Sequence, residues 1–454
     1  MEIIPANEQE KNKTTKIWLL AFPFLFMVLG TIRDCQILPV NKFLLVTIAA
    51  IGFYFFNYEQ IIYFLCFLIP LKEGIPGNYI FLLALIALFL KVPQIHKEQI
   101  IFPVIIIGYE IILSIISPYS IHLIDTVSYC TRIFLVFFLL YTDMSNISIK
   151  KMCLWSSIGV VYLIFIISLV TFLHTGLTKM LTGNRLGPTT QFIPHTHDIM
   201  MFTVNPNGIS YYTGIAFSCF IILLYQDYKE TKLPWSINRT LYLIGLLVVL
   251  LGGLLSVSRT FVVVAVLATF IMFLHICNKQ HWKLAVGIVI GTSILSIIFA
   301  NTELGHTVLK RFVINKNLLT GSGRTDIFKN YLQYQLSHIN ILLFGTGALP
   351  YYQMRGNFLN SMHNMVQQLF FCYGLFGGAF FLYALFKPIG VMIKDKIKIN
   401  VPYSLPFITI VLCAQTTQFL LPNDVLMLFP ICILICEYNL SKKHPETDLL
   451  KKKN

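Results

Sequence analysis

The chain has 454 residues, of which 56% are hydrophobic and 12% charged, and its mean hydropathy is +0.73. These values exclude a soluble globular domain and favour a polytopic membrane protein. The formal net charge of +14 is therefore best interpreted by where the basic residues lie between apolar segments.

Apolar segments recur from residue 17 to residue 438. They predict one all-α transmembrane domain over 1–454, with about 12–14 membrane-spanning helices of roughly 20 residues each. Four of the segments are short for a span, and we expect these to be tilted, re-entrant or extended at their ends. The predicted helices are 17–33, 43–56, 60–71, 79–91, 100–117, 122–141, 152–173, 207–225, 239–257, 260–276, 284–300, 362–386, 402–420 and 424–438.

Basic residues gather in alternate connections between these segments. With the N-terminus in the cytoplasm, Lys97, Lys150, Arg239, Lys387 and the basic C-terminal tail all fall on the cytoplasmic side. The short connections on the other side contain almost no lysine or arginine. This positive-inside pattern predicts that both termini are cytoplasmic.

Two long connections fall on the extracytoplasmic side, namely 174–206 and 301–361. The cytoplasmic connections are short, which leaves no room for a nucleotide-binding domain and excludes an enzyme that uses a nucleotide-sugar donor. Within the second loop, apolar residues at helical spacing predict an amphipathic helix over 324–339, on the membrane surface or over a cavity. The residues on that spacing are Ile327, Phe328, Tyr331, Leu332 and Gln335.

The second loop is basic, with Arg324 and Arg355 among its six lysines and arginines and only two acidic residues. A solvated basic surface is one explanation, because long loops cross the membrane regardless of charge. For the arginines, phosphate binding is the alternative, since the planar guanidinium fork matches phosphate oxygens.

Three charged patterns lie near or within the apolar segments. Arg259, in "SVSRT", sits in a tight hairpin between apolar helices, where a charge indicates a bound anion or a snorkelling side chain. Arg132 and Glu110 lie at compatible depths and predict a structural ion pair, with a role in lipid binding as the alternative. The stretch "HTHD", residues 195–198, is a weak metal signal, because two histidines and one aspartate do not complete a ligand set.

His363 lies at the start of a predicted helix, in "NSMHNMVQQLFF". If the substrate is a sugar linked to a membrane lipid through a diphosphate, the diphosphate is already a good leaving group. Transfer of the sugar then needs charge stabilisation and a base for the incoming hydroxyl. The helix dipole disfavours imidazolium at this position and keeps His363 neutral. Asn364 is placed to orient the ring or an acceptor hydroxyl. Interfacial helix capping is the competing explanation.

Several motifs together resemble the O-antigen ligase and O-antigen polymerase superfamily. They are "GNRLG" and "NPNG" in the first loop, "SVSRT" in the hairpin, "SGRTDIF" in the second loop, and "HN" shortly before "GLFGG". The likeness spans roughly residues 180–385. The resemblance implies a bacterial inner (plasma) membrane protein that is an inverting, metal-independent glycosyltransferase without a cofactor.

The resemblance also implies roles for individual residues. His363 would be the catalytic base, and Arg185, Arg259 and Arg324 would bind the diphosphate. Substrate contacts would come from Asn207, Asn364 and Arg355, and no residue would hold a metal.

The resulting prediction is a polymerase of O-antigen or capsular repeat units. Its donor would be an undecaprenyl-diphosphate-linked oligosaccharide, and its acceptor a sugar hydroxyl of a second one at the outer face of the membrane. The alternatives are a ligase that transfers the glycan to lipid A core in lipopolysaccharide assembly, and a polysaccharide flippase. Besides the bilayer and the lipid-linked glycans, a chain-length regulator and a flippase are the expected partners, and no nucleic acid is expected.

Overall fold

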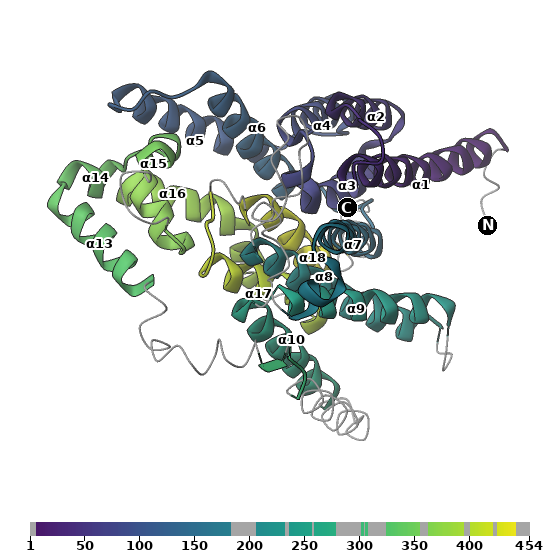
Figure 1. The fold of residues 1–454 in the computed structure, drawn as a ribbon. Helices are drawn as coiled ribbons and strands as arrows, with labels where there is room; N and C mark the ends of the chain where they lie inside the picture. The colour runs from purple at the N-terminus through teal and green to yellow at the C-terminus, as the bar shows by residue number, and fades with distance from the viewer. Residues whose placement is uncertain are drawn as a thin grey trace.

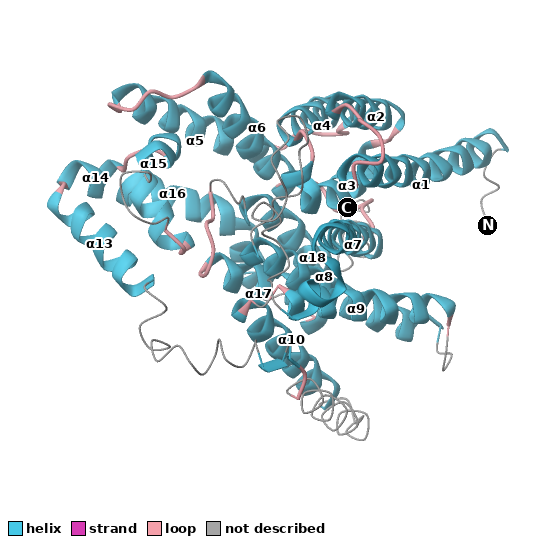
Figure 2. Ribbon diagram, viewed as in Figure 1, coloured by secondary structure: helices cyan, strands magenta, loops and turns pink. Residues whose placement is uncertain are grey.

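Regular secondary structure is entirely helical in the part of the chain that the structure, a computed structural model, describes (Figures 1 and 2). Seven of these helices are long and apolar enough to cross a membrane, and five further apolar helices are shorter. The all-α prediction is confirmed, and the fold is compatible with a polytopic membrane protein; the count of 12–14 spans stays a prediction. The described residues are 6–182, 206–231, 236–256, 258–277, 301–303, 305–306, 324–354, 362–394, 400–420 and 425–441.

Residues 6–182 contain seven α-helices and one 3-10 helix. Asn57 and Gln60 form a capping box that fixes the start of α3, because each side chain accepts from the backbone N–H of the other. Gly159 of α7 allows close packing on α3, since a Cβ there would lie 2.3 Å from the Phe67 carbonyl oxygen. The bounds are α1 (Ala6–Asp34), α2 (Lys42–Phe55), α3 (Tyr58–Leu68), η1 (Ile69–Gly74), α4 (Gly77–Lys91), α5 (Lys97–Ile116), α6 (Leu123–Leu140) and α7 (Ile149–Thr182).

Two differences from the predicted helices in the C-terminal part concern α16 and α17. α16 is interrupted at Gly374, whose φ of 66° is left-handed, and α17 ends at Ala414 instead of residue 420. The predicted helix 284–300 lies outside the described residues. The bounds are α8 (Pro206–Thr231), α9 (Ile237–Leu255), α10 (Arg259–Cys277), α13 (Arg324–Ser337), α14 (Ile339–Phe344), α15 (Ala348–Met354), α16 (Met365–Lys394), α17 (Val401–Ala414), η4 (Val425–Leu428) and α18 (Phe429–Ser441).

The early end of α17 has a visible cause. The side-chain oxygen of Gln368, on α16, accepts the backbone N–H groups of Phe419 and Leu420 at 2.8 and 3.1 Å. Because these two N–H groups are satisfied outside a helix, the chain can leave the helical conformation without leaving buried polar groups unpaired. The segment after α17 is consequently fastened to the N-terminal part of α16.

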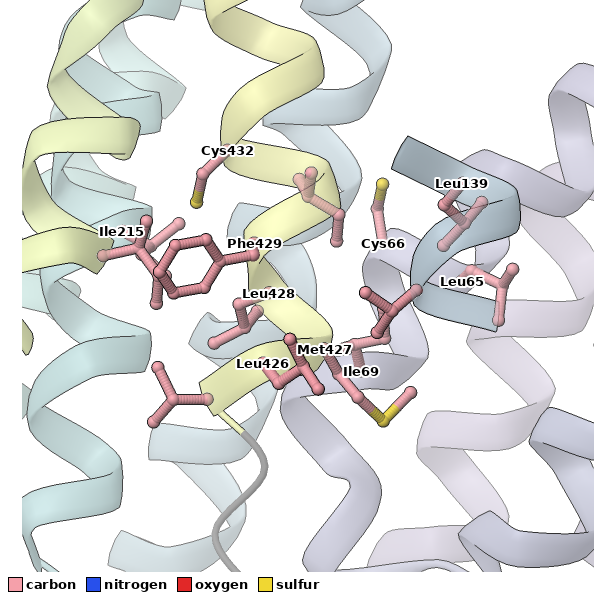
Figure 3. Packing of buried hydrophobic residues seen from close by; sticks show 14 of the residues in the cluster. Leu65, Cys66, Ile69, Leu139, Ile215, Leu426, Met427, Leu428, Phe429 and Cys432 are labelled. Atoms are coloured by element: carbon pink, nitrogen blue, oxygen red, sulfur yellow. The ribbon is translucent and has the colours of Figure 1, made fainter. Parts of the chain in front are cut away.

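The hydrophobic core extends from α1 to α18, and part of it surrounds η4 and the first turns of α18. Leu428, Phe429 and Cys432 are almost fully buried, and they pack against Cys66 of α3 and Ile215 of α8 (Figure 3). A short helix that is apolar on every side is stable only when other helices surround it. At the periphery, α5 and α9 expose many large aliphatic side chains, as helices that face lipid do.

Candidate functional site

Four helix ends converge at one end of the bundle. These are the first residues of α10, α13 and α16 and the residue that follows α17, and we call this region the His363 end, defined by Arg259, Arg324, His363, Asn364 and Gln415. The Asn364 amide nitrogen donates to the Gln415 side-chain oxygen at 3.0 Å. Asn364 and Gln415, which are 51 residues apart in the sequence, therefore meet here.

Two further hydrogen bonds close this arrangement. The hydroxyls of Thr260, in the first turn of α10, and Thr416, just after α17, lie 3.1 Å apart. The Gln367 side-chain nitrogen of α16 donates to the Phe328 carbonyl oxygen of α13 at 2.8 Å. Each of the four helix ends is therefore held by a hydrogen bond to one of the others.

Asn364 begins α16 as its N-cap. Its side-chain oxygen accepts the backbone N–H of Gln367 at 2.9 Å, which satisfies one of the donors left open at a helix start. Its nitrogen is engaged with Gln415, as described above. The asparagine thus fixes the direction in which the chain enters α16, and with it the position of the preceding residue, His363.

His363 is held as a neutral imidazole. Partial burial, and next the positive charge of Arg324, lower the pKa of His363 from 6.5 to about 4. Its Nδ1 atom is buried and has no hydrogen-bond partner among the described residues. A neutral ring with a nitrogen free of protein partners can take a proton from a hydroxyl placed beside it.

Arg324 and Arg259 form the cationic part of the site. Burial, followed by the charge of the neighbouring Arg259, lowers the pKa of the Arg324 guanidinium. Each arginine is the first residue of its helix, where the helix dipole adds further positive potential. Like charges brought together at helix N-termini repel, and a bound anion relieves that repulsion.

The structure brings together four of the seven residues predicted for the site, namely His363, Asn364, Arg259 and Arg324. Asn207 lies in the first turn of α8, and its side chain lies outside the described part of the structure. Arg185, Arg355 and the stretch 195–198 lie outside the described residues. Within the described ranges, no three His, Cys, Asp or Glu side chains are grouped so that they could hold a metal ion.

One predicted pair is wrong. Glu110 does not pair with Arg132; its two carboxylate oxygens accept the backbone N–H groups of Ala348 and Leu349, each at 2.8 Å. The Arg132 guanidinium donates to the Asn78 side-chain oxygen at 3.0 Å. The first turn of a short helix provides two N–H donors to a carboxylate, and apolar helix sequence gives no sign that such a helix end lies next to Glu110.

The glutamines of the site were not predicted. The side-chain amides of Gln367, Gln368 and Gln415 bond the start of α16 to α13 or to the segment that follows α17. The available signal was the occurrence of amide pairs, "QQ" and "QTTQ", at the ends of apolar segments, where amides commonly satisfy backbone groups.

Comparison with known proteins adds no identification. No protein-family model matches the chain, and no curated protein matches it in sequence. The functional proposal below is therefore based on the sequence motifs and on the geometry of the His363 end.

Proposed function

We propose that the chain is a membrane glycosyltransferase that polymerises lipid-linked oligosaccharide repeat units at the outer face of a bacterial inner membrane. The observation that carries this proposal is the juxtaposition of a neutral histidine with two arginines, His363 with Arg324 and Arg259. A base beside a pair of phosphate-binding cations is the set of groups that transfer from a glycosyl diphosphate requires.

In the proposed reaction His363 is the base and the two arginines bind the diphosphate of the donor. The acceptor hydroxyl loses its proton to the imidazole as its oxygen forms a bond to the anomeric carbon. The bond from that carbon to the diphosphate oxygen breaks, and its electron pair leaves with undecaprenyl diphosphate. The guanidinium groups stabilise the negative charge that grows on the departing oxygen, and attack from the opposite side inverts the anomeric centre.

Binding of the donor also strengthens the base. Arg324 is one of the two causes of the low pKa of His363. A diphosphate bound to Arg324 and Arg259 neutralises much of this positive potential, so the pKa of His363 rises when the donor is present. The imidazole then accepts the hydroxyl proton more readily in the complex than in the free protein.

A ligase that transfers the glycan to lipid A core would use the same donor site, and a flippase is the alternative from another class. A flippase favours polar groups near the middle of its helices, whereas Arg259, Arg324 and His363 lie at helix ends. The polymerase and the ligase differ in the acceptor, and the experiment below separates them.

The test is complementation of a strain lacking the gene with His363→Ala, with protein level and membrane insertion measured in parallel. His338→Ala is the matched control, because His338 is an exposed histidine at the start of α14 that stacks on Tyr334. We expect single repeat units to accumulate only in the His363 variant. Long undecaprenyl-linked chains that never reach lipid A would identify a ligase, and an unchanged glycan ladder would refute the catalytic role of His363.

A further inference from the structure

Glu110 joins the segment that carries Arg324 to the apolar helices. It lies in the middle of α5 and is 1% exposed. Its carboxylate accepts two backbone N–H groups at the start of α15, from Ala348 and Leu349. The Tyr373 hydroxyl of α16 also hydrogen bonds to it. A buried carboxylate with this many donors is a fixed structural element.

The link between α14 and α15 packs against the interruption of α16 at Gly374. The interruption at Gly374 frees two carbonyl groups of the preceding turn, and the Phe371 and Cys372 oxygens accept from Thr346 N at 3.1 Å and Gly347 N at 2.7 Å. The close approach depends on a second glycine, because a Cβ at Gly345 would lie 2.3 Å from the Cys372 oxygen. The link between α14 and α15 is therefore bonded backbone to backbone with α16.

α15 is hydrogen bonded to the residue that precedes His363. The hydroxyl oxygen of Tyr351, on α15, accepts the backbone N–H of Met362 at 2.8 Å. Met362 is fully buried and is adjacent in sequence to His363. A displacement of α15 would therefore move the backbone that carries the imidazole.

α13, which begins at Arg324, is also attached to α16. The side-chain nitrogen of Gln335, near the end of α13, donates to the Phe370 carbonyl oxygen of α16 at 2.8 Å. Tyr331 of α13 packs edge-on against Phe371, with ring centroids 5.0 Å apart. α13 and α15 thus pack on the same turn of α16. The hydrogen bonds from Glu110 to α15 therefore help to fix the positions of both Arg324 and His363.

We propose that Glu110 is a positioning residue, whose carboxylate docks α15 on the apolar helices and thereby holds His363 beside Arg324. This inference rests on the proposed function of His363. A glutamine cannot replace the glutamate here, because its NH₂ group would face one of the two N–H donors and leave that donor unsatisfied.

The first test measures docking without reference to activity. Hydrogen exchange of residues 345–354 is compared in wild type, Glu110→Gln and Glu98→Gln, each in lipid nanodiscs. Glu98 is the matched control, since it lies on the same helix and its carboxylate pairs with Lys387 at 3.0 Å. We expect at least about tenfold faster exchange in Glu110→Gln only, because one of the two backbone N–H donors of α15 loses its acceptor. Wild-type protection in this variant would overturn the proposal.

The second test measures the histidine itself. Diethyl pyrocarbonate acylates the neutral imidazole, so its rate of reaction at His363, followed by peptide mass spectrometry, reports the pKa of this residue. With the wild-type pKa of about 4, the rate stays level down to pH 5.5. In Glu110→Gln we expect His363 to become more exposed and to move away from Arg324, which removes both causes of its low pKa. The pKa then rises towards ~6.5, so that the rate falls up to about tenfold between pH 7.5 and 5.5. A level profile in the variant would overturn the positioning role.

Tyr351→Phe provides a milder variant if Glu110→Gln is not inserted. It removes only the oxygen that accepts the Met362 N–H. We expect a pH dependence at His363 with wild-type exchange at 345–354, and a level profile would overturn the connection from α15 to the histidine. Both readouts are independent of glycan synthesis. If the wild-type protein lengthens no glycan while both readouts respond to Glu110→Gln, the proposed function fails and the docking by Glu110 stands.

Discussion

The two ends of the helical bundle differ in how their basic residues are used. At the end opposite His363, three basic residues are paired with carboxylates, and we call this the Lys387 end. Its ion pairs are Lys150–Glu230 at 2.6 Å, Arg239–Asp227 at 3.0 Å and Lys387–Glu98 at 3.0 Å. These cations are neutralised within the protein, so they contribute to topology and packing and are less available to a ligand.

At the His363 end, basic groups are near enough to influence one another. After burial, the charge of Arg259 lowers the pKa of Arg324, and the charge of Arg324 lowers the pKa of His363. The carboxylate of Glu110, which is bonded to the neighbouring α15, is used to bind backbone N–H groups. The comparison teaches that position among helix ends, and not the number of basic residues, distinguishes a candidate anion site from a topological signal.

Removal of Arg324 is expected to have the largest effect on activity. We expect Arg324→Ala to reduce polymerisation by roughly 100-fold or more, because a preorganised cation at a developing negative charge contributes about this much. Arg324→Lys should recover only part of the rate, since lysine lacks the bidentate fork. The measurement is glycan elongation by the purified protein in vesicles. Equal rates for wild type and Arg324→Ala would show that the cationic cluster does not bind the diphosphate.

The pH dependence of the rate should report the influence of Arg324 on His363. Because the pKa of His363 is lowered to about 4, the base is neutral above that value, and kcat/KM should stay level from pH 8 to about 5 and fall as pH approaches 4. Arg324→Gln removes one cause of the lowered pKa, so the acid limb should move to higher pH. If the acid limb does not move in this variant, Arg324 does not influence the pKa of His363.

Asn364→Ala should have an intermediate effect. Loss of an N-cap costs about 1 kcal/mol of helix stability, and the hydrogen bond to Gln415 is lost as well. We expect a lower thermal midpoint of unfolding and a rate decreased by about tenfold, since a small misplacement of a catalytic group is costly. Asn364→Ser, which keeps a capping oxygen, should recover stability more than rate. Full recovery of the rate in Asn364→Ser would show that Asn364 acts only as a helix cap.

Changes at the Lys387 end should have the smallest effect. Lys150 and Glu230 are both partly exposed, at 32% and 56% of their side-chain area, and such pairs contribute about 1 kcal/mol or less. We expect Lys150→Ala to leave the elongation rate within about twofold of wild type. If Lys150→Ala lowered the elongation rate as much as Arg324→Ala, the basic residues at the two ends would not differ in function.

The sequence was informative where hydropathy and local periodicity decide the structure. Apolar segments predicted the helical fold, and the polar starts of predicted helices drew attention to Arg259 and His363. The early end of α17 could not be predicted, because it depends on the distant Gln368. The partner of Glu110 could not be predicted either, because it is a pair of backbone N–H groups that tertiary packing brings to α5.

The most direct test of the central claim is release of undecaprenyl diphosphate from a lipid-linked repeat unit by the purified protein in vesicles. Wild type, His363→Ala and His338→Ala are compared in single-turnover reactions with a second repeat unit as acceptor. We predict release coupled to glycan elongation in wild type and His338→Ala, and neither event in His363→Ala. Equal release by His363→Ala and wild type would contradict the account, because the histidine would then not be the base.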